Sequence, residues 1–126
     1  MPSLIVAEDE PILISLMQTT LVNAGFEVRT AVNGAKVWQM LQDHTQPLPD
    51  IILLDLLMPE MNGYELLEKI HADERLKDIP CLVLSNSGQS DDLNRAYQLG
   101  ANDVLIKTNF NPDQLIGKIH LLLAPK

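Results

Sequence analysis

The stretch IILLDLLMP, residues 51–59, places one carboxylate inside a run of aliphatic side chains. Burying Asp55 in such surroundings costs free energy unless its charge has a partner nearby. Four aliphatic residues in succession before it are typical of a strand in a parallel sheet, which is covered on both faces. The stretch therefore predicts a central strand that ends on a charged residue, and it raises the question of what that charge meets.

Four more segments have strand character, and they lie at residues 4–7, 26–31, 81–84 and 104–106. Helical spacing fills the intervals between and after these strands. Five strands that alternate with five helices predict an α/β fold, a doubly wound five-stranded parallel sheet of the flavodoxin-like kind. The strand order expected for this pattern is 2-1-3-4-5, and ligands bind such sheets beyond the carboxyl ends of the strands, between the first and third.

The expected helices carry recognisable start signals. Pro11 is a favourable first residue, and Asn33 and Asn111 are typical N-caps. The other two helices are expected at residues 64–72 and 91–99. The inward stripe predicted for the first helix consists of Ile12, Leu13, Leu16, Met17 and Leu21.

The composition limits the classes of function. A chain of 126 residues with 46% hydrophobic residues is about one domain long, so residues 1–126 are expected to form a single domain. The formal charge of −8 and the scattering of nine basic residues argue against a surface for nucleic acid or for an anionic membrane. The beginning of the chain lacks the features of a signal peptide, and no apolar run reaches the length of a membrane span. One cysteine, Cys81, cannot form an internal disulfide, so we expect a buried thiol and a cytoplasmic protein.

Charged and polar residues follow the predicted strands at their carboxyl ends. Glu8 and Asp9 follow the first strand, and Asp55 ends the third, so three carboxylates are expected at one edge of the sheet. Two unit charges about 4 Å apart repel by about 4 kcal/mol at an effective dielectric constant of 20. Such a cluster needs a cation, and Mg²⁺, a hard ion with oxygen ligands, fits best. Lys107 after the fifth strand and Ser85 at the end of the fourth are placed to add a positive charge and a hydroxyl group.

Each of these residues also has an ordinary explanation when it is taken alone. Glu8, Asp9 and Glu10 precede a helix, and acidic residues are favourable at helix N-termini. Asp55 can cap a turn, Lys107 can be solvated, and Ser85 can be a turn residue. The argument for a site is that all of them fall at the carboxyl ends of separate predicted strands.

Four segments together resemble the response-regulator receiver domain, the phosphoacceptor module of two-component signalling. They are LIVAEDEP at 4–11, IILLDLLMPEMNGYELL at 51–67, LVLSNSG at 82–88 and LGANDVLIKTNF at 99–110.

The resemblance implies a role for each residue at the strand ends. Asp55 would accept a phosphoryl group and ligate Mg²⁺, together with Asp9, with Glu8 through a bound water, and with the backbone carbonyl of Leu57. Ser85 would hydrogen-bond the phosphoryl oxygen, and Lys107 would pair with Asp55 and then with the phosphoryl group.

The resemblance also implies partners. The phosphoryl donor would be a phosphohistidine on a histidine kinase or histidine phosphotransfer protein, and a downstream protein target would read the result. Movement of Ser85 would couple the site to the face formed by the fourth helix, the fifth strand and the fifth helix, which could also pair two copies of the chain. Such a module is a signalling protein that catalyses only its own phosphorylation and dephosphorylation. The sequence leaves open whether it acts alone or within a longer regulator.

Four positions depart from the family pattern. Val104 stands where the aromatic switch residue is usual, three positions before the lysine, and Thr108 stands where proline usually follows it. A cis bond costs about 2.5–4 kcal/mol when the next residue is not proline, so the bond from Lys107 to Thr108 is expected to be trans. Asn86 replaces a very small residue beside the site, and Glu8 replaces the commoner aspartate.

Three other functions are compatible with parts of the pattern. A Mg²⁺-dependent phosphatase of the haloacid-dehalogenase kind also uses an aspartate nucleophile, but it needs a second acid where Leu57 stands. A flavodoxin-like cofactor binder needs Gly and Ser or Thr in the first loop, which reads EDEP here. A pseudoreceiver would keep the fold for protein contacts without phosphorylation, and Val104 and Thr108 leave that alternative open.

Overall fold

The structure is a computed structural model that describes residues 1–58, 60–86, 90–109 and 111–124. Its sheet is parallel throughout, with the strand order β2-β1-β3-β4-β5 that the sequence predicted. The strands are β1 (Ser3–Ala7), β2 (Glu27–Ala31), β3 (Ile51–Asp55), β4 (Cys81–Ser85) and β5 (Asp103–Ile106).

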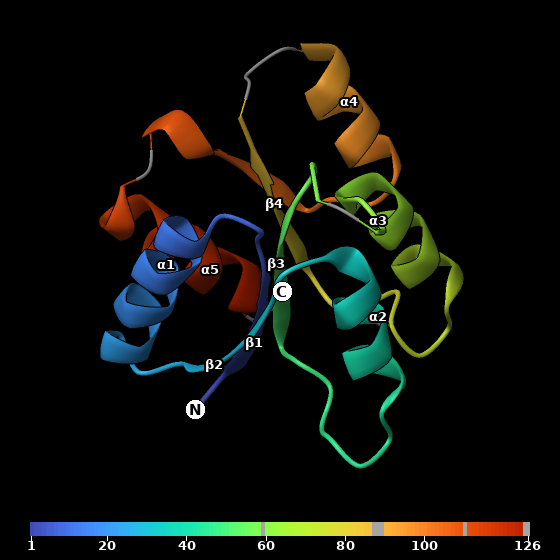
Figure 1. The fold of residues 1–126 in the computed structure, drawn as a ribbon, viewed down its shortest axis with the longest axis horizontal. Helices are drawn as coiled ribbons and strands as arrows, with labels where there is room; N and C mark the ends of the chain where they lie inside the picture. The colour runs from blue at the N-terminus through green and yellow to red at the C-terminus, as the bar shows by residue number, and fades with distance from the viewer. Residues whose placement is uncertain (59, 87–89, 110, 125–126) are drawn as a thin grey trace.

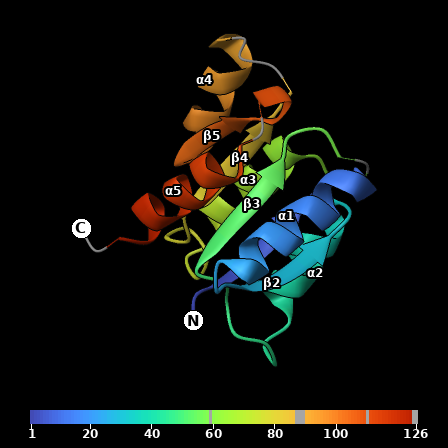
Figure 2. The same ribbon diagram turned by 90° about the vertical axis from the view of Figure 1, so that its left-hand side faces the viewer.

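The helices lie on both faces of this sheet (Figures 1 and 2). They are α1 (Pro11–Asn23), α2 (Gly34–Gln42), α3 (Gly63–Ala72), α4 (Ser90–Gln98) and α5 (Pro112–Leu123), and a short 3₁₀ helix, η1 (Lys107–Asn109), follows β5. Helices α1 and α5 cover one face, whereas α2, α3 and α4 cover the other (Figure 1). Asn33, Asn62 and Asn111 each accept hydrogen bonds from backbone N–H groups in the first turn of α2, α3 and α5.

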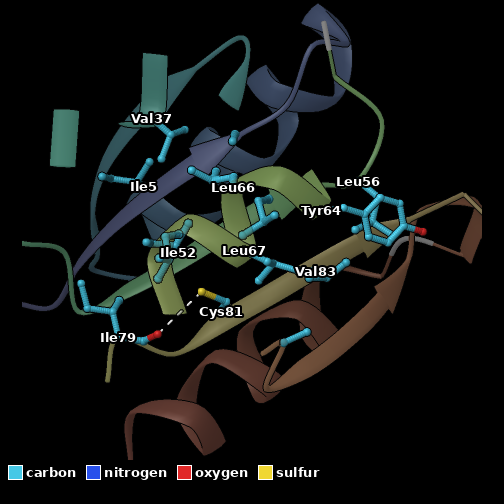
Figure 3. Packing of buried hydrophobic residues seen from close by; sticks show 14 of the residues in the cluster. Ile5, Val37, Ile52, Leu56, Tyr64, Leu66, Leu67, Ile79, Cys81 and Val83 are labelled. Carbon is cyan, nitrogen blue, oxygen red and sulfur yellow. Dashed lines mark hydrogen bonds between the residues drawn. The ribbon is translucent and has the colours of Figure 1, made fainter. Parts of the chain in front are cut away.

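The hydrophobic core has two halves, one on each face of the sheet. Leu4 and Val6 of β1 point to the α1 and α5 side, and Ile5 and Ala7 point to the other. All four side chains are fully buried, as expected for a central strand of a parallel sheet. Figure 3 shows part of the second half, in which residues of α3 pack against β3 and β4.

The prediction for the inward stripe of α1 is partly wrong. Met17 and Leu21 are buried, but Ile12 is 86% and Leu16 is 46% exposed. Successive residues of a helix turn by about 100°, so Leu21 lies near the direction of Met17 whereas Leu16 and Ile12 point well away from it. One narrow line of side chains is therefore enough to attach α1 to the sheet.

Strand register brings the carboxyl ends of the strands to one edge. Ala7 pairs with Leu54, and Asp55 pairs with Leu84. Ser85 pairs with Ile106, so Lys107 lies one residue beyond the level of Ser85. Within the described part of the chain, no helix is both long and apolar enough to cross a membrane.

Candidate functional site

The residue at the centre of the predicted site is Lys107. Its side chain is only 5% exposed, although it is a lysine. The ammonium donates to Glu8 Oε1 at 3.1 Å, to Asp55 Oδ2 at 3.1 Å and to Glu10 Oε1 at 3.2 Å. Burial disfavours its charge, but the hydrogen bonds to Asp55 and Glu8 outweigh that effect and raise the pKa of Lys107 above its usual value. Lys107 is therefore a fixed positive charge among carboxylates.

Glu8 is the least solvated of these carboxylates, with no exposed surface. Its Oε1 accepts from Lys107 and from the backbone N–H of Glu10. Its Oε2 is buried without a hydrogen bond among the described residues, although the Lys107 ammonium lies 3.1 Å away. Burial, and then the charge of Asp55, raise the pKa of Glu8 from 4.5 to about 7. One buried carboxylate oxygen thus lacks a full set of partners.

Asp9 completes an acidic group with Glu8 and Asp55. One carboxylate oxygen from each of the three lies within 4.8 Å of the others. Asp9 is exposed, whereas Glu8 and Asp55 are buried, so the group lies at the boundary between core and solvent. A set of oxygen ligands with an incompletely satisfied carboxylate oxygen suits Mg²⁺, which binds through one or two carboxylates and keeps several waters.

Asp55 is held by the backbone that follows it. Its side chain is 2% exposed, and its Oδ1 accepts from the backbone N–H of Leu57 at 3.2 Å. The N–H of Gly63, the first residue of α3, donates to the carbonyl of Leu56 at 3.0 Å. A Cβ at Gly63 would collide with the carbonyl oxygen of Asp55 and lie 2.7 Å from Leu56 Cα. The start of α3 can therefore lie this close to the backbone of Asp55 and Leu56 only because its first residue is a glycine.

Ser85 lies at the end of β4 and is 4% exposed. It lines a cavity of about 140 Å³ together with Asp55, the main residue of the predicted site. Asn86, which the sequence placed beside the site, lines the same cavity. The lining also includes three residues that sequence reasoning did not assign to the site, Tyr64, Asp92 and Arg95.

The structure thus brings the predicted residues of β1, β3, β4 and β5 together at one edge. It also adds Glu10, which the sequence explained only as an acid before a helix, as a third carboxylate on Lys107. The bond from Lys107 to Thr108 is trans, as expected without proline. Val104 is half-buried and packs against the core on the α2, α3 and α4 side. The role expected for the Leu57 carbonyl is not tested by the contacts found here.

Comparison with known proteins identifies the family to which the chain is similar. The family model of the response regulator receiver domain matches residues 4–120. The DNA-binding dual master transcriptional regulator RpaA of Synechocystis is 35% identical over 123 residues, which are 98% of this chain and 49% of that protein. Chemotaxis protein CheY1 of Helicobacter pylori J99 is 31% identical over 122 residues, which are 96% of both chains. The chain therefore spans about half of the former relative and nearly all of the latter.

Solved structures of response regulators have the same fold as this chain. Chemotaxis response regulator CheY4 of Vibrio cholerae superimposes with a TM-score of 0.89 at 27% identity, covering 98% of this chain and 99% of that one. The phosphorylated cyanobacterial phytochrome response regulator RcpA has a TM-score of 0.86 at 33% identity, covering 98% and 94%. The Mn²⁺-bound form of response regulator Rcp1 has a TM-score of 0.86 at 28% identity, covering 100% and 98%.

Proposed function

The chain belongs to the response regulator receiver domain family of two-component signalling, and from this premise we propose that Asp55 is its phosphoacceptor. The observation that carries the proposal is the contact of 3.1 Å between Asp55 Oδ2 and the buried Lys107 ammonium. A buried carboxylate that lines a cavity and contacts a fixed cation is suited to nucleophilic attack on phosphorus. The phosphorylated state named for the similar RcpA supports the same chemistry.

Mg²⁺ is the cofactor that the acidic group would hold. Asp9 and Asp55 would be direct ligands, Glu8 would act through a water, and the carbonyl of Leu57 would complete the protein ligands. The Mn²⁺-bound form of Rcp1 supports a divalent ion at this kind of site. When it is bound, the ion supplies positive charge that neutralises the transferring phosphoryl group.

The protein's own residues position the reaction. An oxygen of Asp55 forms the O–P bond while the N–P bond of a phosphohistidine donor breaks and its electrons return to the histidine nitrogen. Phosphoryl transfer depends mainly on positioning and charge stabilisation. Lys107 meets both needs, because its ammonium already lies at hydrogen-bond distance from Asp55. Ser85, which lines the same cavity, would donate a hydrogen bond from its hydroxyl group to a phosphoryl oxygen.

The proposed chemistry implies a partner that donates the phosphoryl group and a partner that recognises the phosphorylated protein. The phosphoryl group would come from a histidine kinase or a histidine phosphotransfer protein. The product carries nearly two negative charges and three acceptor oxygens, and its contacts with Ser85 would alter the start of the segment that leads to α4. A downstream protein, or a second copy of the chain, would then recognise the face of α4, β5 and α5.

Intact-mass measurement tests the proposal directly. The protein is incubated with acetyl phosphate or phosphoramidate, with Mg²⁺ or with EDTA, and compared with Asp55→Asn. An acyl phosphate adds about 80 Da by the chemistry proposed, and we expect this addition only in the unmodified sequence with Mg²⁺. Addition that persists in Asp55→Asn would assign the wrong nucleophile. Failure of phosphorylation in every condition would favour a pseudoreceiver, and continuous hydrolysis of an organic phosphate would favour a phosphatase.

A further inference from the structure

Two helices, α3 and α4, contribute side chains to the lining of the cavity beside Asp55. Tyr64 belongs to the first turn of α3 and is 9% exposed. Its hydroxyl lies 3.4 Å from Asp92 Oδ1 on α4. The guanidinium carbon of Arg95, also on α4, lies 4.0 Å from the centroid of the Tyr64 ring. Tyr64 packs beside Leu56, the neighbour of Asp55 (Figure 3). Its hydroxyl group and its ring face contact Asp92 and Arg95 of α4.

Arg95 keeps hydrogen-bonding capacity in this arrangement. No ion pair found in the described part of the chain involves Arg95. A guanidinium that stacks on a ring uses its flat face, so the N–H groups at its edge stay available. Those N–H groups form a fork that matches two oxygens of a phosphoryl group. Stacking on Tyr64 thus orients a donor for anions without occupying it.

The site can accommodate a further positively charged donor. The Lys107 ammonium is shared among three carboxylates before any phosphoryl group is present. Phosphorylation would add nearly two negative charges and three acceptor oxygens. Asp92 also lines the cavity, but it lies one helical turn before Arg95 and its carboxylate is engaged with the Tyr64 hydroxyl. Arg95 is the guanidinium on this cavity and can supply the additional positive charge.

We propose that Arg95 binds the phosphoryl group on Asp55 across this cavity and that Tyr64 is the positioning residue that holds its guanidinium there. This inference rests on the proposed phosphorylation of Asp55. Arg95 belongs to α4, so its side chain would connect that helix directly to the phosphoryl group. Tyr64 is also an aromatic residue in the half of the core against which Val104 packs, and β5 itself contains no aromatic residue. Coupling between the site and α4 then passes through Tyr64 and Arg95.

Titration with beryllium fluoride in the presence of Mg²⁺ tests the proposal, because this anion imitates a phosphoryl group on an aspartate. We expect Arg95→Ala to weaken binding about tenfold, which corresponds to about 1.4 kcal/mol. Arg95→Lys should recover part of the loss because it keeps the charge. Tyr64→Leu should weaken binding by removing the stacking face, whereas Tyr64→Phe keeps that face and should weaken it less. Lys77→Ala removes a partly exposed cation paired with Glu74 and should leave binding unchanged.

A readout on the unaltered protein separates phosphoryl binding from a structural role. The NMR signal of the Arg95 Nε–H group should shift on addition of beryllium fluoride with Mg²⁺ and should not shift in Asp55→Asn. Equal affinities for the unaltered protein and Arg95→Ala, together with an unchanged Arg95 signal, would overturn the proposal. If the unaltered protein binds no beryllium fluoride and gains no phosphoryl mass, the proposed function itself fails. If the unaltered protein does bind beryllium fluoride, equal affinity of Arg95→Ala with an unchanged Arg95 signal refutes the role of Arg95 and leaves the proposed function standing.

Discussion

Replacing Glu8 with glutamine should remove a pH dependence from the stability of the metal-free protein. Glu8 has no exposed surface, and one of its oxygens has no hydrogen bond among the residues described. Burial and the nearby charge of Asp55 raise its pKa from 4.5 to about 7. The folded protein therefore binds a proton at Glu8 more tightly than the unfolded chain does. This contribution to stability is complete below pH 4.5 and is lost as the pH rises through 7.

The two pKa values fix the size of the effect. With a pKa of 4.5 in the unfolded chain and about 7 in the folded protein, the free energy of unfolding should fall by roughly 2–3 kcal/mol between pH 5 and pH 8 through this group alone. Lys107 stays protonated over this interval because its pKa is raised. Mg²⁺ should oppose the trend, since a cation favours the ionised carboxylate and binds the folded state.

Urea unfolding at pH 5, 6, 7 and 8 measures the effect. The unaltered protein and Glu8→Gln are compared in EDTA, so that all other titrating groups cancel between them. The two curves of stability against pH should diverge by roughly 2–3 kcal/mol over this interval. Added Mg²⁺ should stabilise the unaltered protein more at pH 8 than at pH 6. Parallel curves in EDTA would refute the reasoning, because they would mean that Glu8 titrates alike in the folded and unfolded states.

Three more perturbations have defined outcomes. Lys107→Met leaves buried carboxylates without their cation and should reduce the free energy of unfolding at pH 8 by about 3 kcal/mol; urea unfolding measures the loss, and an unchanged midpoint would contradict it. Gly63→Ala places a Cβ against the carbonyl of Asp55 and should cost about 2 kcal/mol or more in thermal unfolding. The matched control is Gly117→Ala in α5, where a Cβ meets nothing within 4 Å, and it should stabilise by about 1 kcal/mol. Burial raises the pKa of the Cys81 thiol to about 12, so a thiol reagent at pH 8 should label it only after unfolding; rapid labelling of the native protein would show that the thiol is accessible.

The convergence of the site residues could be predicted from the sequence because it follows from topology. Parallel strands place their carboxyl ends at one edge, so residues after separate apolar runs must meet there. That argument brought Glu8, Asp55 and Lys107 together, although they are up to 99 positions apart. Register then determines the level of each residue, and the pairing of Ser85 with Ile106 places Lys107 one residue beyond the level of Ser85.

The directions in which side chains point were harder to predict from the sequence than the convergence of the strand ends. Glu10 was assigned to the start of a helix, but its carboxylate reaches Lys107. Tyr64 was expected only to begin a helix at residues 64–72, and Arg95 only to lie within a helix at residues 91–99. Their contact depends on how α3 and α4 pack against each other, which no local pattern encodes. The exposure of Ile12 was missed for a similar reason, since an apolar side chain in a helix predicts burial only when the direction of the sheet is known.

The most direct test of the central claim locates the phosphoryl group on the chain. The phosphorylated protein is reduced with borohydride, which converts an aspartyl phosphate to homoserine, and is then digested and sequenced by mass spectrometry. We predict homoserine at position 55 alone, and only in samples that contained Mg²⁺. Modification at Asp9 or at another residue, or equal modification of Asp55 in EDTA, would contradict the account.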